Sequence, residues 1–177
     1  MYKKLSILKI FFEDPIGEYH IREIARLTRL NHMTVSNYLI KFVKINLLNK
    51  KKTKLYPTYS ANFSNKEFIN LKLYYNLEQL RKSEIIGDLE KKYDYPAIVL
   101  FGSYASATNT KDSDVDICVI TNINKEFSLT EYEKRLNKKI SIFKFGEKEL
   151  KNMKIKNPEL VNNICNGIML SGKLEVI

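Results

Sequence analysis

The sequence predicts a mixed α/β (α+β) fold made of two modules, and three observations carry this prediction. Before residue 96, apolar residues recur mostly at helical spacing. Two short apolar runs, residues 97–101 and 115–120, have the length and β-branched content of buried strands. The charge is uneven, because residues 1–62 hold 12 Lys and Arg against 4 Asp and Glu, whereas residues 63–177 hold 18 against 16. We therefore expect a basic module at 1–62, connecting helices at 63–96 and a domain with a mixed sheet at 97–177.

Bulk composition argues against several classes of protein. The 177-residue chain is 44% hydrophobic, which is ordinary for domains that bury a core. No apolar run approaches the roughly 20 residues that cross a bilayer, so we expect a cytoplasmic protein without a membrane partner. Cys118 and Cys165 lack metal-ligand spacing and are expected to be buried, reduced thiols.

The net charge of +10 predicts attraction to a polyanion, most simply nucleic acid. The alternative, a compositional drift toward lysine, would spread the charge evenly.

Three helices are predicted in the basic module. Residues 2–12 and 21–28 each carry an amphipathic apolar stripe. A third helix begins after Asn31, a suitable N-cap, and buries Val35 and Leu39.

The spacing of the second and third helices resembles the helix-turn-helix of transcription regulators. Ala25 is small where two helices cross closely, and Val35, ten residues later, packs one helix over the other. Arg29 stands where that pattern usually has a turn glycine, so we expect the turn to differ in detail. The positions expected to face outward, toward a DNA major groove, are His32, Met33, Thr34, Ser36, Asn37 and Lys41.

A basic hairpin is predicted directly after the third helix. Residues 47–59 indicate two short strands around a turn that contains Lys50, Lys51 and Lys52. Such a wing would bring its lysines near DNA phosphates. We therefore predict a winged helix-turn-helix DNA-binding domain at 1–62. The alternative is a three-helix scaffold whose solvated lysine loop binds another protein.

Two connecting helices are expected before the first strand. Residues 64–82 and 83–93 both show helical apolar spacing, and Tyr95-Pro96 ends the second. Gly87 weakens the second helix by about 1 kcal/mol of propensity.

Two motifs with a fixed spacing follow. The strand at 97–101 leads directly to Gly102 and Ser103, and ten residues later the acids Asp114 and Asp116 open the next apolar run. Gly102 permits a tight turn, where backbone N–H groups and the Ser103 hydroxyl can hold nucleotide phosphates. Side chains alternate along a strand, so the two acids are expected on one face, about 7 Å apart. There they can share divalent ions that serve phosphoryl transfer.

This Gly-Ser, ten residues, Asp-x-Asp arrangement resembles the minimal nucleotidyltransferases of the DNA polymerase β superfamily. The whole chain resembles archaeal-type proteins that fuse a winged helix to such a domain. The resemblance implies that Gly102 and Ser103 bind a nucleoside triphosphate, with ATP the expected one. It implies that Asp114 and Asp116 are catalytic and bind Mg²⁺. It also implies nucleotidyl transfer to a hydroxyl and an antitoxin role, in which such domains modify or neutralise HEPN-type toxins.

One departure from that family concerns a third acid. Active members carry it on a later strand, and the matching stretch, residues 139–143, has Ser141 at the expected position. A serine is neither an ionised ligand nor a base near neutral pH. Glu147 and Glu149 would have to reach back from the next helix.

A second departure lies just after the Gly-Ser turn. Residues 105–107 read Ala-Ser-Ala, where relatives often show Arg-Gly after Gly-Ser-aromatic-Ala, so a positive charge near the phosphates is missing. Both departures favour an alternative function: a catalytically impaired transcriptional regulator or antitoxin that binds DNA and a nucleotide or protein partner.

The C-terminal residues carry no chemistry that we recognise. Helices are predicted at 147–153 and 158–166. Residues 168–170 and 174–176 are expected to add either an edge strand or a contact in a homodimer.

Overall fold

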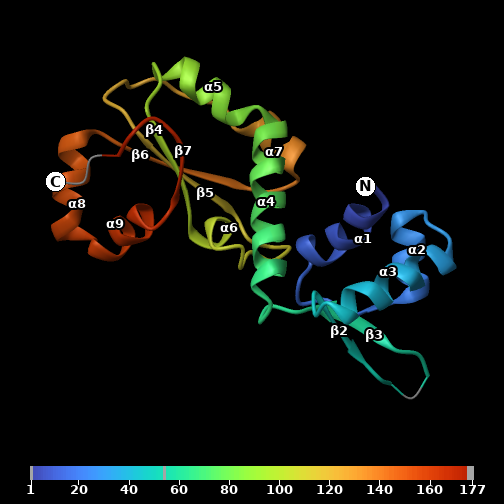
Figure 1. The fold of residues 1–177 in the computed structure, drawn as a ribbon. Helices are drawn as coiled ribbons and strands as arrows, with labels where there is room; N and C mark the ends of the chain where they lie inside the picture. Colours follow the sequence, from blue (N-terminus) through green and yellow to red (C-terminus); the bar gives the residue numbers. More distant parts are fainter. Residues whose placement is uncertain (1, 54, 175–177) are drawn as a thin grey trace. The chain divides into compact units, whose positions relative to one another are not determined.

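The computed structural model describes residues 2–53 and 55–174, and the chain divides into two compact units at residues 75 and 76. Each unit contains helices and a β-sheet (Figure 1), which confirms the predicted mixed α/β fold class. Among the described helices, none combines the length and hydropathy that a bilayer-spanning segment requires.

The three helices predicted in the first unit are present as α1 (Tyr2–Glu13), α2 (Ile21–Thr28) and α3 (His32–Lys44). The Asn31 side chain accepts a 2.7 Å hydrogen bond from the backbone of Thr34, which confirms the predicted N-cap. Their packed core includes Ile7, Leu8, Phe11, Ile24, Val35, Leu39 and Phe42.

The turn between α2 and α3 explains the arginine in place of a glycine. Arg29 itself adopts the left-handed conformation, with φ of 55°, directly after α2. That conformation costs a non-glycine residue about 1 kcal/mol or more, so Arg29 replaces glycine at the expense of local strain.

The predicted hairpin is formed by β2 (Leu48–Lys51) and β3 (Thr58–Ala61), which pair antiparallel. Lys50 and Lys51 lie within β2 and not in the turn, which corrects the prediction. Residue 54, which falls within the predicted hairpin at 47–59, lies outside the described residues. A further strand that the sequence did not predict, β1 (Tyr19–His20), pairs with β3 and completes a sheet of order β1-β3-β2.

Two helices follow the hairpin, as predicted. They are α4 (Lys66–Ser83), which is continuous through residues 75 and 76, and α5 (Ile85–Lys92). The Ser83 hydroxyl accepts a weak 3.4 Å hydrogen bond from the backbone of Ile85. The domain boundaries expected at residues 62 and 96 stay predictions.

The second unit is built on a mixed sheet of order β6-β5-β4-β7. Its strands are β4 (Ala97–Phe101), β5 (Val115–Ile120), β6 (Ile140–Phe145) and β7 (Ile168–Ser171). β4 is antiparallel to both β5 and β7, whereas β5 and β6 run parallel. β7 is the edge strand expected for residues 168–170; of residues 174–176, the last two lie outside the described residues.

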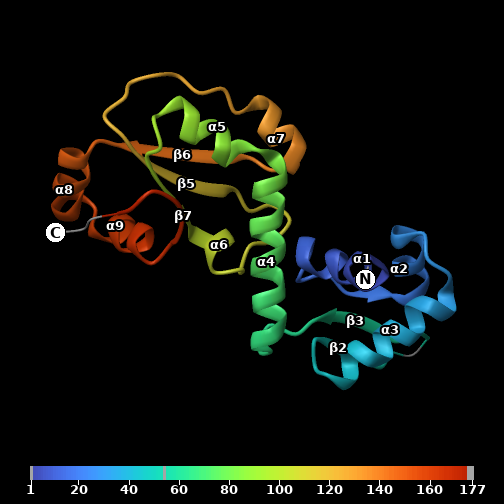
Figure 2. The ribbon, with the colours of Figure 1, turned by 45° about the horizontal axis from the view of Figure 1, so that its top comes forward.

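The two faces of this sheet are covered differently. One face packs against Leu80 of α4, Leu89 of α5 and the half-buried side chains of α7 (Thr130–Leu136), a helix that the sequence did not predict. The other face packs against Ile164 of α9 (Pro158–Cys165), which follows α8 (Glu147–Lys156). Figure 2 shows α5 and α7 on one side of the sheet and α9 on the other. Both C-terminal helices were predicted.

Candidate active site

The backbone of Gly102 lies against the carboxylate of Asp116. Gly102 opens the short helix α6 (Gly102–Ala105) directly after β4, with φ of +68°. A Cβ at this residue would come within 2.5 Å of Asp116 Oδ2. Glycine is therefore required for the backbone conformation and also for the close approach to the acid. Gly102 is exposed and Ser103 half-buried, so this turn is open to solvent.

Asp116 lies near the start of β5, a strand that has a neighbour on each side. In β5 it pairs with Phe101 of β4 on one side and with Ser141 of β6 on the other. Burial raises the pKa of the Asp116 carboxyl, and the charge of Asp114 raises it further. The ionised form of the half-buried Asp116 is therefore disfavoured, and a cation bound beside it would relieve this cost.

Asp114 is an exposed residue one position before β5 and not within the strand, which corrects the prediction of strict alternation. Its negative charge nevertheless adds to the effect of burial in raising the pKa of the Asp116 carboxyl.

The ten residues between the two motifs are held by buried amides. Asn76 donates hydrogen bonds to the Tyr104 carbonyl at 3.0 Å and to Asn109 Oδ1 at 2.8 Å, and both Asn side chains are buried. Further along, Ser113 Oγ accepts a 2.9 Å hydrogen bond from the backbone of Thr110. The connection from the Gly-Ser turn to Asp114 is therefore an ordered loop. α6 ends at Ala105, before this loop begins.

Ala107 has a backbone conformation that glycine would adopt at a lower cost. It is fully buried and has φ of 56°, a conformation that L-residues adopt at a cost. The preceding residue, Ser106, is exposed, and its hydroxyl donates to the Gly102 carbonyl at 3.2 Å. An arginine at that exposed position would add positive charge beside the turn, and Ser106 does not.

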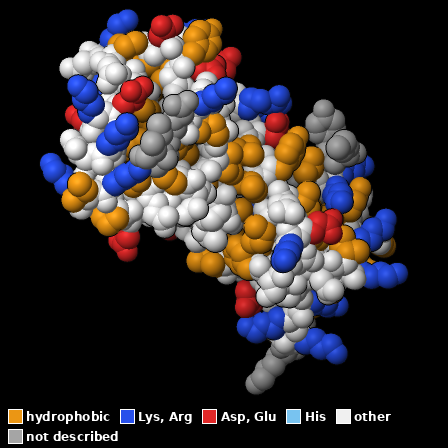
Figure 3. All heavy atoms as spheres, turned by 60° about the vertical axis from the view of Figure 1, so that its left-hand side comes forward, with side chains coloured by type: hydrophobic (Ala, Val, Ile, Leu, Met, Phe, Trp, Pro, Cys, Tyr) orange, Lys and Arg blue, Asp and Glu red, His pale blue; other side chains and the backbone are white. Residues whose placement is uncertain are grey.

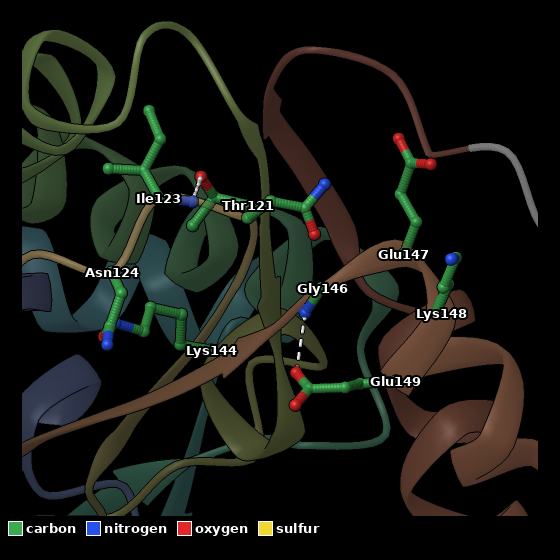
Figure 4. Close-up of a pocket in the computed structure, with 9 residues that line it drawn as sticks. Thr121, Ile123, Asn124, Lys144, Gly146, Glu147, Lys148 and Glu149 are labelled. Carbon is green, nitrogen blue, oxygen red and sulfur yellow. Dashed lines mark hydrogen bonds between the residues drawn. The ribbon is translucent and has the colours of Figure 1, made fainter.

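Neither Glu147 nor Glu149 takes the place of the third acid. Ser141 and Asp116 lie near the start of the parallel strands β6 and β5, on the same face of the sheet. Glu147 and Glu149 lie past the other end of these strands, in a pocket of about 670 Å³. There Glu149 accepts a 2.9 Å hydrogen bond from the backbone of Gly146 (Figure 4). Throughout the described ranges, no cluster of three or more His, Cys, Asp or Glu residues has an arrangement that could hold a metal ion.

The residues predicted to contact DNA lie in the first unit. On α3, His32, Asn37 and Lys41 are exposed, whereas Thr34 and Ser36 are half-buried. Two apolar residues of the same helix are also exposed. Met33, which was expected to face outward, is 70% exposed, and Ile40, which the sequence analysis did not include, is 60% exposed.

Lys50, Lys51 and Lys52 are all exposed on the hairpin. Figure 3 shows Lys and Arg side chains along both sides of this projecting segment. Lys51 differs from the other two because its Nζ pairs with Glu18 at 3.0 Å. It is therefore partly neutralised within the unit.

Comparisons with known proteins find a sequence similarity that lies in the second unit. Residues 82–166 match the sequence model of the nucleotidyltransferase domain family. A protein of Methanocaldococcus jannaschii whose name proposes it to be a protein adenylyltransferase is 46% identical over 55 residues, or 31% of this chain and 53% of that protein. The chain thus spans about half the length of this curated relative. A solved structure from Sulfolobus solfataricus, described as that of a proposed nucleotidyltransferase, is also similar. It has a TM-score of 0.33 at 15% sequence identity, over 53% of this chain and 80% of that chain. Residues 82–166, which include Gly102, Asp114 and Asp116, are therefore similar in sequence to nucleotidyltransferase domains.

Proposed function

We propose that the chain transfers a nucleotidyl group from a nucleoside triphosphate, with ATP the expected donor, to a hydroxyl in a Mg²⁺-dependent reaction. The observation that carries this proposal is the approach of the Gly102 backbone to the Asp116 carboxylate, with Asp114 beside it. In this arrangement the turn at Gly102 and Ser103 binds phosphates, and the two carboxylates lie next to those phosphates.

The two carboxylates fit a magnesium ion. Burial and, secondarily, the charge of Asp114 raise the pKa of Asp116, and a bound cation would offset both effects. Mg²⁺ prefers oxygen ligands and is commonly held by one or two carboxylates together with substrate phosphates. Asp114 and Asp116 would hold it, and when bound it supplies positive charge that stabilises the transferring phosphoryl group. The exposed Gly102 and half-buried Ser103 would orient the triphosphate.

We take a protein hydroxyl as the acceptor. The name of the Methanocaldococcus jannaschii relative describes that protein as a proposed protein adenylyltransferase. We extend this to the present chain and propose that the acceptor is a tyrosine, serine or threonine of a HEPN-type toxin partner, in keeping with the predicted antitoxin role.

The test is transfer of label from α-³²P-ATP. Purified protein is incubated with Mg²⁺ and candidate acceptors that include a HEPN-type toxin, beside an Asp114→Asn/Asp116→Asn double variant. We expect label on an acceptor with the wild type alone. Equal label with the double variant, or none with either protein, would reject the proposed transfer.

A second candidate function is favoured by one observation, the serine beside Asp116. With Ser141 in register and no described glutamate replacing it, the domain would bind a metal-nucleotide complex or a partner protein without transferring the nucleotide. The chain would then act as a regulator or antitoxin. Mg²⁺-dependent nucleotide binding without label transfer is the result that distinguishes this function from the first.

We also propose that the first unit is a winged helix-turn-helix that binds DNA. The element order α1-β1-α2-α3-β2-β3 supports this, as do the exposed polar residues His32, Asn37 and Lys41 of α3 and the exposed lysines of the hairpin. Residues 1–62 carry a net charge of +8, from 12 Lys and Arg and 4 Asp and Glu. Affinity for duplex DNA that falls steeply with salt is the expected result, and salt-independent affinity would contradict it.

A further inference from the structure

We propose that α3 recognises A·T base pairs in the major groove, with Met33 and Ile40 contacting thymine methyl groups and Asn37 contacting adenine. The inference rests on the proposed DNA binding of the first unit, and it names the sequence class that this unit selects.

The outward side of α3 is a single ridge. Met33, Asn37, Ile40 and Lys44 follow one another at intervals of four, three and four residues, which places them on one line along a helix. All four are exposed, whereas Val35, Leu39 and Phe42 on the opposite side are buried in the core of the unit. The part of α3 that a groove would meet first is therefore two apolar side chains with an amide between them.

These side chains match the edge of an A·T pair. In the major groove, thymine alone presents a methyl group, and an Asn amide can both accept from adenine N6 and donate to N7. Met33 and Ile40 are seven residues apart, or about 10 Å along the helix axis. That distance corresponds to roughly three base-pair steps of 3.4 Å. One ridge can therefore contact a short run of A·T pairs.

The flanking charge favours DNA over a protein as the occupant of this ridge. Exposed Lys41 and Lys44 lie beside the apolar residues, and exposed Lys50 and Lys52 lie on the hairpin that follows α3. Protein interfaces are depleted of lysine at their centre, whereas phosphates on both sides of a groove attract it. Met33 and Ile40 are also separated by Asn37, so they do not form a continuous apolar patch.

Deoxyuridine isolates the methyl contact. Three duplexes of equal length are compared by fluorescence anisotropy: a mixed A·T sequence, the same sequence with every dT replaced by dU, and a G·C sequence. Replacing dT with dU removes only the major-groove methyl group and leaves the backbone charge and the minor-groove edge unchanged. We expect the wild type to bind the dT duplex about tenfold more tightly than the dU duplex, given about 0.8 kcal/mol for each of two methyl contacts.

Variants assign the effect to the ridge. In Met33→Ala/Ile40→Ala the difference between dT and dU should vanish. It should persist in Ile16→Ala, a matched control that trims an apolar residue, 74% exposed, outside α3. Asn37→Ala should reduce the preference for A·T over G·C while keeping the sensitivity to dU.

Each remaining outcome overturns a specific claim. Equal, salt-dependent binding to all three duplexes would reject the sequence preference and leave DNA binding intact. An A·T preference that is indifferent to dU would indicate reading of the minor groove and would also reject the inference. Absence of salt-dependent binding to every duplex would instead reject the proposed DNA binding itself.

Discussion

Asp116 of β5 and Ser141 of β6 are register partners in a parallel pair of strands. Adjacent strands lie about 4.8 Å apart, and paired residues point to the same face of the sheet. The side chain beside the half-buried acid is therefore a hydroxyl at the position where the family resemblance implies a carboxylate. Without a carboxylate at this position, the site has no described general base beside Asp116, which favours binding of a nucleotide over its transfer.

Replacing Ser141→Asp should increase nucleotidyl transfer. A carboxylate beside Asp116 could accept the proton of the attacking hydroxyl, and general bases contribute typically 10²-fold or more, so we expect a gain of about 10- to 100-fold in the rate of label transfer. Ser141→Asn is the matched control, since it has the same shape and no base. A similar rate for both variants would show that the missing acid does not limit the reaction.

Gly102→Ala should destabilise the second unit and abolish nucleotide binding. The new Cβ would lie 2.5 Å from Asp116 Oδ2, on a backbone with φ of +68°. Denaturant unfolding should show a loss of about 1–3 kcal/mol. In Gly87→Ala, by contrast, the added Cβ meets no atom within 4 Å and lies in the middle of α5. That control should gain about 0.5–1 kcal/mol, and a similar loss in both variants would contradict the account.

Asp116→Asn should stabilise the fold at neutral pH. Because burial and Asp114 raise the pKa of Asp116 in the folded state, the ionised carboxylate costs stability. This cost appears as pH rises from the pKa of the unfolded chain through the higher folded pKa, and it is complete above that value. The variant should therefore have a Tm a few degrees higher at pH 7, with the difference shrinking as pH is lowered toward 4.

The control for this substitution is Asp112→Asn, which removes an exposed acid outside the pair. It should leave the Tm nearly unchanged. Mg²⁺ should raise the Tm of the wild type and have a smaller effect on Asp116→Asn, because binding to the folded state stabilises it. An Asp116→Asn variant that is less stable than the wild type at pH 7 would refute the repulsion between the two acids.

Asn76→Ala should weaken both the fold and the site. It removes the donor to the Tyr104 carbonyl and to Asn109 Oδ1 within a buried environment, at a cost of about 1–3 kcal/mol. Because the loop that these bonds hold carries Asp114, affinity for the nucleotide should fall as well. Asn162→Ala, which removes an exposed amide of α9, should change the stability by less than about 0.5 kcal/mol.

Removing hairpin lysines should lower the salt dependence of DNA binding. Each lysine that contacts a phosphate contributes roughly 0.9 to the slope of log K against log salt. Lys50→Ala and Lys52→Ala should each reduce the slope by about this amount. Lys51→Ala should reduce it less, because Lys51 already pairs with Glu18. Unchanged slopes in all three variants would favour the protein-binding alternative.

The elements with a strong local signal were predictable from the sequence. The residues of β4 and β5 are mostly apolar and rich in β-branched side chains, which is typical of buried strands. Asn31 has a side-chain oxygen that can accept the hydrogen bond of a helix N-cap. Elements defined by distant partners were not predictable. β1 is two residues long and exists through its pairing with β3. The apolar stripe of α7 is short, because it consists of the half-buried Tyr132 and Leu136 alone.

The candidate site was predictable in its composition and less so in its geometry. The spacing of the Gly-Ser and Asp-x-Asp motifs identified Gly102 and Asp116, but the contact between them depends on the pairing of β4 with β5. Asp114 was assigned to the strand because local periodicity gives no exact strand start. Ile40 was missed because an apolar residue in a helix is ordinarily assigned to the core, and its exposure depends on which side of α3 packs.

The most direct test of the central claim is the binding of a metal-nucleotide complex, followed by isothermal titration calorimetry. α,β-Methylene-ATP, which resists transfer, is titrated into wild-type protein with Mg²⁺, with EDTA, and into the Asp114→Asn/Asp116→Asn variant with Mg²⁺. The account predicts saturable binding with one site in the first titration and its loss in the other two. Binding that is equal in all three, or absent from the first, would contradict the assignment of Gly102, Ser103, Asp114 and Asp116 as a metal-nucleotide site.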